Sequence, residues 1–327
     1  EWKSNLASSA VSVPQNRMLK SILKNNTLIA NDYIEFNTAS NGHYTIGTIG
    51  GNPNSSTDDN KKMLFGHPGG GTSKTTIVVG ESINEFTSSN VTYDADGSKS
   101  VSKASYDGVD VTQELSIIEN SATGRDDVVK IKYIVKNDTE YAKQVGIRIM
   151  MDTMLGGNDA APFRVNGSDV TTETVYSGSN IPQIWQAFDS ATNPGVVAQG
   201  TFYKSGDRKP DKVQFTNWGN VTSTLWDYVT QPGRSNGDSA VSITWNKDTF
   251  TSGETREFVT YYGLSELEQN LIPPLALSVY ADNKVSISNF NYDDINANVY
   301  LDNIGDGDAT DVSINCLLYT SPSPRDA

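Results

Sequence analysis

The sequence predicts an all-β protein, built as a large antiparallel β-sandwich followed by part of a second, smaller β-sandwich. Thr, Ser, Asn, Asp and Gly are abundant, while the helix formers Leu, Ala, Glu and Lys are comparatively scarce, a bias that favours strands joined by turns. Asn41-Gly42 and Asp107-Gly108 each lie between runs of β-branched and aromatic residues, which predicts two hairpins. No alternation of strands with helices is visible, which disfavours a parallel sheet.

Alternating apolar and polar side chains predict strands along most of the chain. The turn signals recur roughly every 10 residues, a spacing typical of a sandwich or barrel. The predicted strands are the two arms of the first hairpin (Tyr33 to Phe36 and Tyr44 to Ile49), then Thr75–Val79, Val91–Tyr93, Ser98–Tyr106, Val109–Ile118, Asp127–Val135, Val145–Met151, Val170–Tyr176, Val196–Tyr203, Ala240–Trp245 and Arg256–Leu264.

The double proline Pro273-Pro274 suggests a domain boundary. We expect a leader at residues 1–27, a large sandwich at 28–270, a linker at 271–274 and a truncated module at 275–315. Four short apolar runs fit the opening strands of that module, whereas a complete immunoglobulin-like sandwich needs about 100 residues. These runs are Leu275–Tyr280, Lys284–Phe290, Ala297–Leu301 and Val312–Ile314.

The last residues, 316–327, resemble a translated sequencing adapter of the kind used in shotgun libraries. We therefore expect a non-native tail on a fragment from the assembly of a microbial community. The single cysteine, Cys316, belongs to this tail, and one cysteine excludes both a disulfide scaffold and a Cys-rich zinc site.

The charge of the chain bears on its partners. The formal net charge of −14 repels phosphate backbones and anionic lipid surfaces, so nucleic acid and membranes are disfavoured as partners. No apolar run approaches the roughly 18 to 20 residues of a membrane-spanning helix. An acidic, cysteine-poor, strand-rich chain fits an extracellular or cell-surface location.

Several stretches resemble the N-terminal supersandwich domain of clostridial-type bacterial surface proteins, which is related to sugar-mutarotase and polysaccharide-lyase β-domains. The resemblance would cover about residues 28–270, and residues 299–311 (VYLDNIGDGDATD) are similar to immunoglobulin-like stalk modules. It implies a fold but carries over no catalytic residue. The stretches are DYIEFNTASNGHYTIG (32–47), KMLFG (62–66), VGIRIMMDTMLGGNDAAPF (145–163), IPQIWQAFD (181–189) and VTYYGL (259–264).

A candidate cation site follows the strand that ends at Asp152. A Gly-Gly turn would bring Asn158 and Asp159 back towards Asp152, and hard cations such as Ca²⁺ take oxygen ligands of this kind. The alternative is a tight turn whose Asp and Asn side chains accept hydrogen bonds from backbone N–H groups. The spacing of these residues does not fit an EF-hand, so the calcium signal is weak. The sequence leaves two expectations open for the cofactor: none, or Ca²⁺.

A group of aromatic residues is the second candidate site. Trp185, Trp218, Trp226 and Tyr228 lie close together in the sequence, and sugars stack their apolar faces on exposed rings of this kind. The alternative is that these rings belong to the core, which is strongest for Trp245 within its alternating strand.

Catalysis has weaker support from the sequence. His67, in the segment FGHPGGG, is the candidate catalytic residue, whereas His43 belongs to the first hairpin turn. Carboxylates are plentiful, but the sequence cannot pair two of them across a sugar. No nucleophile elbow, Walker loop or Rossmann fingerprint is present.

The sequence thus predicts a surface or secreted module, more consistent with a non-catalytic role than with an enzyme. Adhesion, glycan contact and envelope architecture are the expected roles. A carbohydrate-active enzyme of the mutarotase, lyase or glycosidase kind is the alternative.

Overall fold

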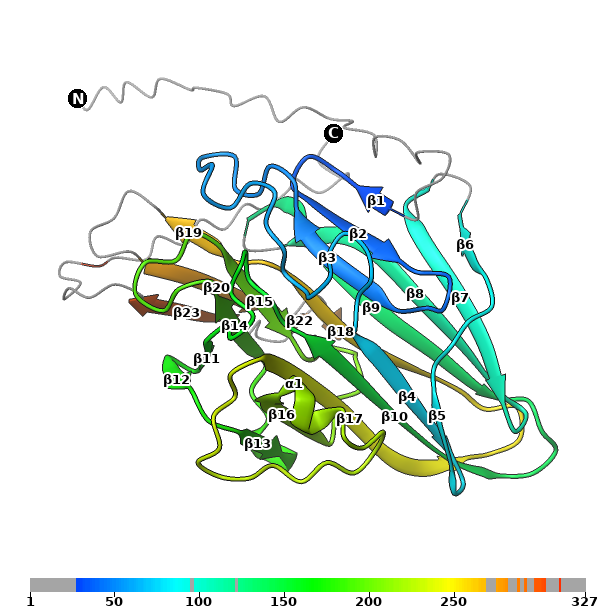
Figure 1. Ribbon diagram of the computed structural model, residues 1–327. Coiled ribbons are helices and arrows are strands. Elements are labelled where there is room, and N and C mark those ends of the chain that lie inside the picture. Colours follow the sequence, from blue (N-terminus) through cyan, green and yellow to red (C-terminus); the bar gives the residue numbers. More distant parts are fainter. Residues whose placement is uncertain are drawn as a thin grey trace.

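The computed structural model describes residues 28–94, 97–120, 123–268, 275–281, 287–288, 291–292, 297–303 and 312. It is an antiparallel β-sandwich, as the alternating pattern predicts, with two large sheets and a small third sheet around one core (Figure 1). The leader, the adapter-like tail and most of the truncated module lie outside the described residues. No helix among the described residues is long and apolar enough to cross a membrane.

Nine strands form the larger sheet, in the order β12-β11-β14-β15-β18-β9-β8-β7-β6. Its centre is formed by the long neighbouring strands β8, β9 and β18, which pair antiparallel, with one register shift between Ile118 and Asn120 of β8. The strands are β6 (Val91–Tyr93), β7 (Lys99–Tyr106), β8 (Val109–Asn120), β9 (Arg125–Asn137), β11 (Phe163–Val165), β12 (Ser168–Val170), β14 (Ile184–Phe188), β15 (Val197–Thr201) and β18 (Thr255–Leu264).

Six strands form the smaller sheet, in the order β13-β16-β17-β10-β4-β5. β10 lies next to β17, although more than eighty residues separate them in the sequence, and this pairing positions the site described below. The strands are β4 (Lys74–Val79), β5 (Ser82–Glu85), β10 (Lys143–Asp152), β13 (Thr174–Ser177), β16 (Lys212–Asn217) and β17 (Ser239–Phe250).

The third sheet consists of β1 (Leu28–Ala30), β2 (Ile34–Thr38) and β3 (Tyr44–Thr48), with β2 and β3 forming the predicted Asn41-Gly42 hairpin. It contacts β7 and β8 of the larger sheet through two buried hydrogen bonds. Gln113 Nε2 donates to the Gly42 carbonyl (2.9 Å), and the Thr38 and Ser100 hydroxyls are 2.8 Å apart.

The core lies between the sheets and follows the predicted period of two. In β9, Val129, Ile131, Tyr133 and Val135 point inward, and the intervening positions face out. In β10, Val145, Ile147, Ile149 and Met151 are buried against them. Burying an apolar side chain of this size stabilises the fold by roughly 1.5 to 3 kcal/mol. A one-residue shift in strand pairing would expose the whole apolar set, so the register of these strands is fixed.

The outer face of the smaller sheet is also covered, which the sequence did not predict. Residues 218–238 run over it, beginning with the short helix α1 (Trp218–Val221). Val221 and Tyr228 pack on Met150 and Ala240. Trp226 lies so close to β10 that a Cβ on Gly146 would be 2.7 Å from its ring, so glycine is required there. We call residues 218–238 the covering segment.

One predicted strand is divided in the structure. Residues 170–176, predicted as one strand, are two: β12 ends at Val170 in the larger sheet, and β13 begins at Thr174 in the smaller sheet. A single-sequence pattern does not reveal that the chain changes sheets between them. A 3₁₀ turn, η1 (Gly178–Asn180), follows β13.

The predicted linker at 271–274 lies outside the described residues, but the strands on either side of it pair with each other. β19 (Glu266–Glu268) is antiparallel to β20 (Leu275–Ala281), which pairs with β23 (Ala297–Asn303). β21 (Ile287–Ser288) and β22 (Asn291–Tyr292) form a separate pair. Ser278 on β20 accepts from Gln186 Nε2 at 3.3 Å and donates to Gln199 Oε1 at 2.6 Å, which joins β20 to the larger sheet.

Candidate functional site

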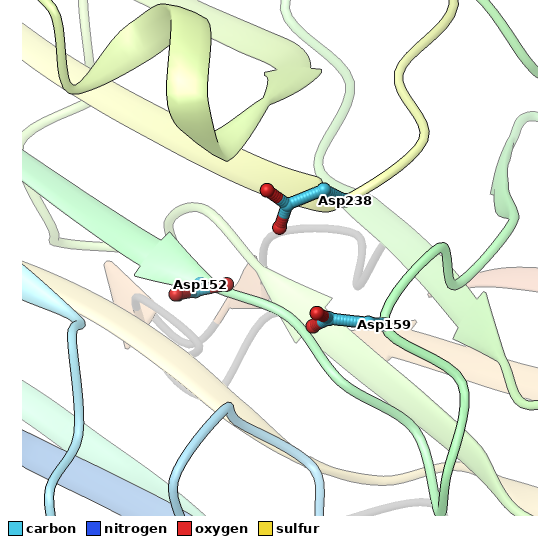
Figure 2. A group of neighbouring side chains, drawn as sticks. All are labelled: Asp152, Asp159 and Asp238. Carbon is cyan, nitrogen blue, oxygen red and sulfur yellow. The ribbon is translucent and has the colours of Figure 1, made fainter.

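Three aspartates converge at one end of the smaller sheet (Figure 2). Asp152 ends β10, Asp159 lies in the loop that follows, and Asp238 immediately precedes β17. One carboxylate oxygen from each lies within 4.8 Å of the others. The antiparallel pairing explains this: Asp152 is opposite Ala240, so the end of β10 meets the start of β17.

Asp152 is the buried member of the cluster, with only 2% of its surface exposed. Its Oδ2 accepts a hydrogen bond from the Thr72 hydroxyl, while its Oδ1 is buried and has no hydrogen-bond partner among the described residues. Asp159 Oδ1 is in the same condition. Two buried carboxylate oxygens of the cluster therefore have no hydrogen-bond donor among the described residues.

The pKa values follow from this environment. Burial raises the pKa of Asp152 to about 7, with the charges of Asp238 and Asp159 adding to the rise and the Thr72 hydrogen bond opposing it. Burial also raises the pKa values of Asp159 and Asp238, and the charge of Asp159 adds to the rise at Asp238. A nearby cation would remove this penalty on the charged forms.

The sequence named Asp152, Asn158 and Asp159, whereas the structure brings together Asp152, Asp159 and Asp238. Asn158 Nδ2 donates to the Asp189 carbonyl (2.9 Å), and its Oδ1 accepts from Ala160 N–H (2.9 Å). Asn158 therefore acts as the turn residue of the alternative interpretation. The sequence gives no sign that Asp238 lies near Asp152, because only strand pairing brings the two together.

Beside the cluster, the outer face of the smaller sheet is polar and buried under the covering segment. Arg148, Gln214, Ser242 and Thr244 share this face, because Arg148 is paired with Thr244 and Gln214 with Ser242. None is more than 2% exposed. We call these four residues the polar floor.

Each residue of the polar floor has a buried side-chain atom without a hydrogen-bond partner among the described residues. These atoms are Arg148 Nε, Gln214 Oε1, Ser242 Oγ and Thr244 Oγ1. Arg148 uses its other nitrogens to donate to the carbonyls of Val221, Thr224 and Trp226 at 3.0 to 3.1 Å. Gln214 Nε2 donates to the Tyr228 carbonyl at 2.9 Å. The polar floor thus holds the covering segment by hydrogen bonds and still has four side-chain atoms that could form further hydrogen bonds.

Glu173 also holds the covering segment, at residues on either side of those bonded by Arg148. Its carboxylate accepts hydrogen bonds from the Tyr228 hydroxyl (2.8 Å to each oxygen), Gln231 N–H (2.8 Å) and Asn220 Nδ2 (2.9 Å), and also from Thr216. Burial alone would raise its pKa, but these hydrogen bonds outweigh burial and lower it. No sequence signal marked Glu173, because its partners are distant in the chain.

The four aromatic candidates are buried to different degrees. Trp185 is 1% exposed, stacks on Tyr262 with 5.3 Å between ring centroids, and lies over Gly200, where a Cβ would be 2.0 Å from its ring. Trp226 and Tyr228 are 8% and 7% exposed. Trp218 is half-buried against Met150 and its neighbours. The rings thus pack in the core and under the covering segment, and form no exposed strip for a sugar.

His67 is buried in the structure, with 6% of its surface exposed. Its Nε2 lies 2.9 Å from Glu35 Oε1 and its Nδ1 lies 3.2 Å from Thr45 Oγ1. His43 lies in the hairpin, as predicted, with its Nε2 3.0 Å from Glu85 Oε1. Both nitrogens of His67 have protein partners, which is the arrangement of a structural histidine.

Among the comparisons with known proteins, only the search of solved structures finds similar proteins. No family model matches the chain, and no curated protein does. A galactose mutarotase related enzyme from Lactobacillus acidophilus is 8% identical, with a TM-score of 0.42 over 74% of this chain and 97% of that one. A galactose mutarotase-like protein from Lactobacillus casei is 10% identical, with a TM-score of 0.40 over 72% and 99%. A polysaccharide lyase is 9% identical, with a TM-score of 0.42 over 84% of this chain and 43% of that one. The sandwich assignment rests on the strand pairing of this chain.

Proposed function

We propose that this chain is a non-catalytic β-sandwich module of an extracellular or cell-surface bacterial protein, and that it contacts glycans through the polar floor. Adhesion and envelope architecture are roles that such contact would serve. The net charge of −14 and the single cysteine fit this location. A non-catalytic module needs no titratable pair within reach of a substrate.

The observation that carries the proposal is the set of unpartnered atoms on the polar floor: one guanidinium N–H, one amide oxygen and two hydroxyls. Adjacent strands lie about 4.8 Å apart, and alternate residues of a strand about 6.7 Å apart. Such a patch has the dimensions of one sugar ring, whose hydroxyls both donate and accept hydrogen bonds. A buried polar group without a hydrogen-bond partner destabilises the protein, so a polar ligand that forms hydrogen bonds with these atoms would bind favourably.

Access to the floor requires the covering segment to move, since the four floor residues are at most 2% exposed. Binding that awaits such a movement has a low association rate. We therefore expect slow association, below about 10⁵ M⁻¹ s⁻¹.

The placement of the acidic and histidine side chains bears on the choice between binding and catalysis. A general acid or base must come within hydrogen-bond distance of the substrate. Asp152, whose pKa of about 7 would suit an acid, is 2% exposed, and His67 is engaged by Glu35 and Thr45. The alternative, a carbohydrate-active enzyme, would require the same movement of the covering segment to bring Asp152 within reach of the sugar, and release of a sugar product distinguishes it from binding.

The test is a glycan array probed with the full chain and with Ser242→Ala. This substitution removes an unpartnered hydroxyl, so we expect at least a tenfold loss of glycan binding with folding stability unchanged or slightly higher. Ser116→Ala, on the outer face of the larger sheet, is the matched control and should bind as the parent chain does.

Three outcomes would contradict the proposal. They are an array without any bound glycan, equal binding by Ser242→Ala and the parent chain, and a sugar product released on incubation. The last would favour the enzyme alternative.

A further inference from the structure

The three aspartates belong to segments whose backbones are tied together independently of the carboxylates. Ser239 N–H donates to the Asp159 carbonyl (2.8 Å), and Thr153 N–H donates to the Ser239 carbonyl (2.9 Å). Trp218 N–H donates to the Asp238 carbonyl (2.7 Å), which closes the base of the covering segment. The backbone thus fixes three carboxyl groups close together, and their side chains gain nothing from one another.

Like charges at this distance repel, and burial strengthens the repulsion. Asp152 is 98% removed from solvent, since 2% of it is exposed, yet its Oδ1 has no donor. Figure 2 shows the carboxyl groups of Asp159 and Asp238 pointing towards Asp152. Burial raises the pKa of Asp159, and the charge of Lys62 opposes that rise only in part. Asp152 thus has two like-charged neighbours, and Lys62 offsets only part of the effect of burial at Asp159.

We propose that Asp152, Asp159 and Asp238 bind a hard divalent cation of the Ca²⁺ class. The donor set is oxygen only, which suits Ca²⁺ or Mg²⁺ and not Zn²⁺, which favours nitrogen and sulfur ligands. The three ligands come from the end of a strand and two loops, an adaptable arrangement that suits Ca²⁺ better than the strict octahedron of Mg²⁺. Water completes the coordination.

The cation would also act on the covering segment. Asp238 is the last residue of that segment and adopts a left-handed backbone conformation with φ of 59°. Because Asp152 belongs to the sheet, a cation shared by the two would fasten the base of the segment to the end of β10. This inference does not depend on glycan binding, and its test measures metal alone.

The first measurement is thermal unfolding of the full chain after chelator treatment and dialysis, with added CaCl₂, MgCl₂ or ZnCl₂. A hundredfold excess of Ca²⁺ over its Kd should raise Tm by roughly 5 to 10 °C for a chain of this size. Isothermal titration should give about one site, with Ca²⁺ bound more tightly than Mg²⁺ and Zn²⁺.

The second measurement uses Asp238→Asn, which removes a less buried ligand and avoids the folding risk of changing Asp152. We expect at least a tenfold loss of Ca²⁺ affinity. The metal-free variant should be as stable as the metal-free parent or more stable, because one repelling charge is gone. Asp110→Asn, an exposed aspartate on the larger sheet, is the matched control and should bind Ca²⁺ as the parent does.

Lys62→Gln tests whether the lysine ammonium takes the place of a metal. With a metal site, this variant binds Ca²⁺ at least as tightly as the parent, since a competing positive charge is removed. The proposal is overturned if Ca²⁺ and Mg²⁺ leave Tm unchanged, if Zn²⁺ binds most tightly, or if Asp238→Asn binds Ca²⁺ like Asp110→Asn. A metal-free Asp238→Asn much less stable than the metal-free parent would also overturn it.

Discussion

The two large sheets bury their inner faces alike, but their outer faces differ. The outer face of the larger sheet carries charged side chains in partly exposed ion pairs, with Lys132 Nζ 3.1 Å from Glu114 and 3.2 Å from Glu257. The outer face of the smaller sheet carries Arg148, which is 1% exposed and bonded to three backbone carbonyls of the covering segment.

The difference shows how one chain uses cations in two ways. An exposed Lys–Glu pair contributes little to folding stability, because water and salt screen the attraction between the two charges. A buried guanidinium under a segment with little regular structure donates to carbonyls that would otherwise lack donors, so its removal is costly. Glu173 does the same for hydroxyl, amide and backbone donors. One buried cation and one buried anion hold the covering segment in place.

The largest expected effect comes from Arg148→Met. It leaves the carbonyls of Val221, Thr224 and Trp226 without their donor, and we expect a loss of about 3 kcal/mol in the free energy of unfolding. Burial lowers the pKa of Arg148 to about 10, so removing a desolvated charge offsets part of the cost. Urea unfolding measures this loss. A loss below about 1 kcal/mol would mean that buried Arg148 contributes no more than an exposed ion pair on the outer face of the larger sheet.

Glu173→Gln comes next, with an expected loss of about 2 kcal/mol at pH 7, because an amide replaces the charged acceptor of several hydrogen bonds. Glu81→Gln, at a fully solvated position, should stay within about 0.5 kcal/mol.

The effect of Glu173→Gln should depend on pH. The folded-state pKa of Glu173 lies below its usual value of 4.5. Its contribution is therefore complete above the unfolded-state pKa and is lost as pH falls through the folded-state value. The stability gap between the parent and Glu173→Gln should narrow below about pH 4.5. Urea unfolding at pH 7 and at about pH 3 checks this, and an unchanged gap would show that the charge of Glu173 is not what holds the segment.

The smallest effect is expected for Lys132→Met. The ion pairs with Glu114 and Glu257 are partly solvated, so their loss should cost less than about 1 kcal/mol and should diminish further in salt. Unfolding in low and high salt measures it. A loss as large as that of Arg148→Met would mean that the larger sheet depends on its surface charges.

Most of the strands could be predicted from the sequence because their signals are local. The Asp107-Gly108 turn has both residues at positive φ (49° and 79°), as the hairpin signal requires, and joins β7 to β8. β16 (Lys212–Asn217) was not predicted, since the segment around Phe215 and Trp218 resembles a turn. Its strand conformation depends on pairing with β17, which only tertiary structure supplies.

The candidate site was predictable only in part. Asp152 and Asp159 are separated by one tight turn, so their proximity is visible in the sequence. Asp238 and the polar floor depend on the pairing of β10 with β17 and of β17 with β16. The burial of Trp185, Trp226 and Tyr228 depends on which segments cover them, and an aromatic residue near a glycine gives no sign of that.

The sequence by itself determined most of the strands, which of their faces is apolar, and where the hairpins turn, because side-chain period and turn chemistry act over a few residues. The tertiary structure alone decided which strands become neighbours, that residues 218–238 cover the smaller sheet, and that a third aspartate joins Asp152 and Asp159. The reason is physical: contacts between residues far apart in the chain form only when whole sheets bury their apolar faces together. That burial depends on the entire set of strands.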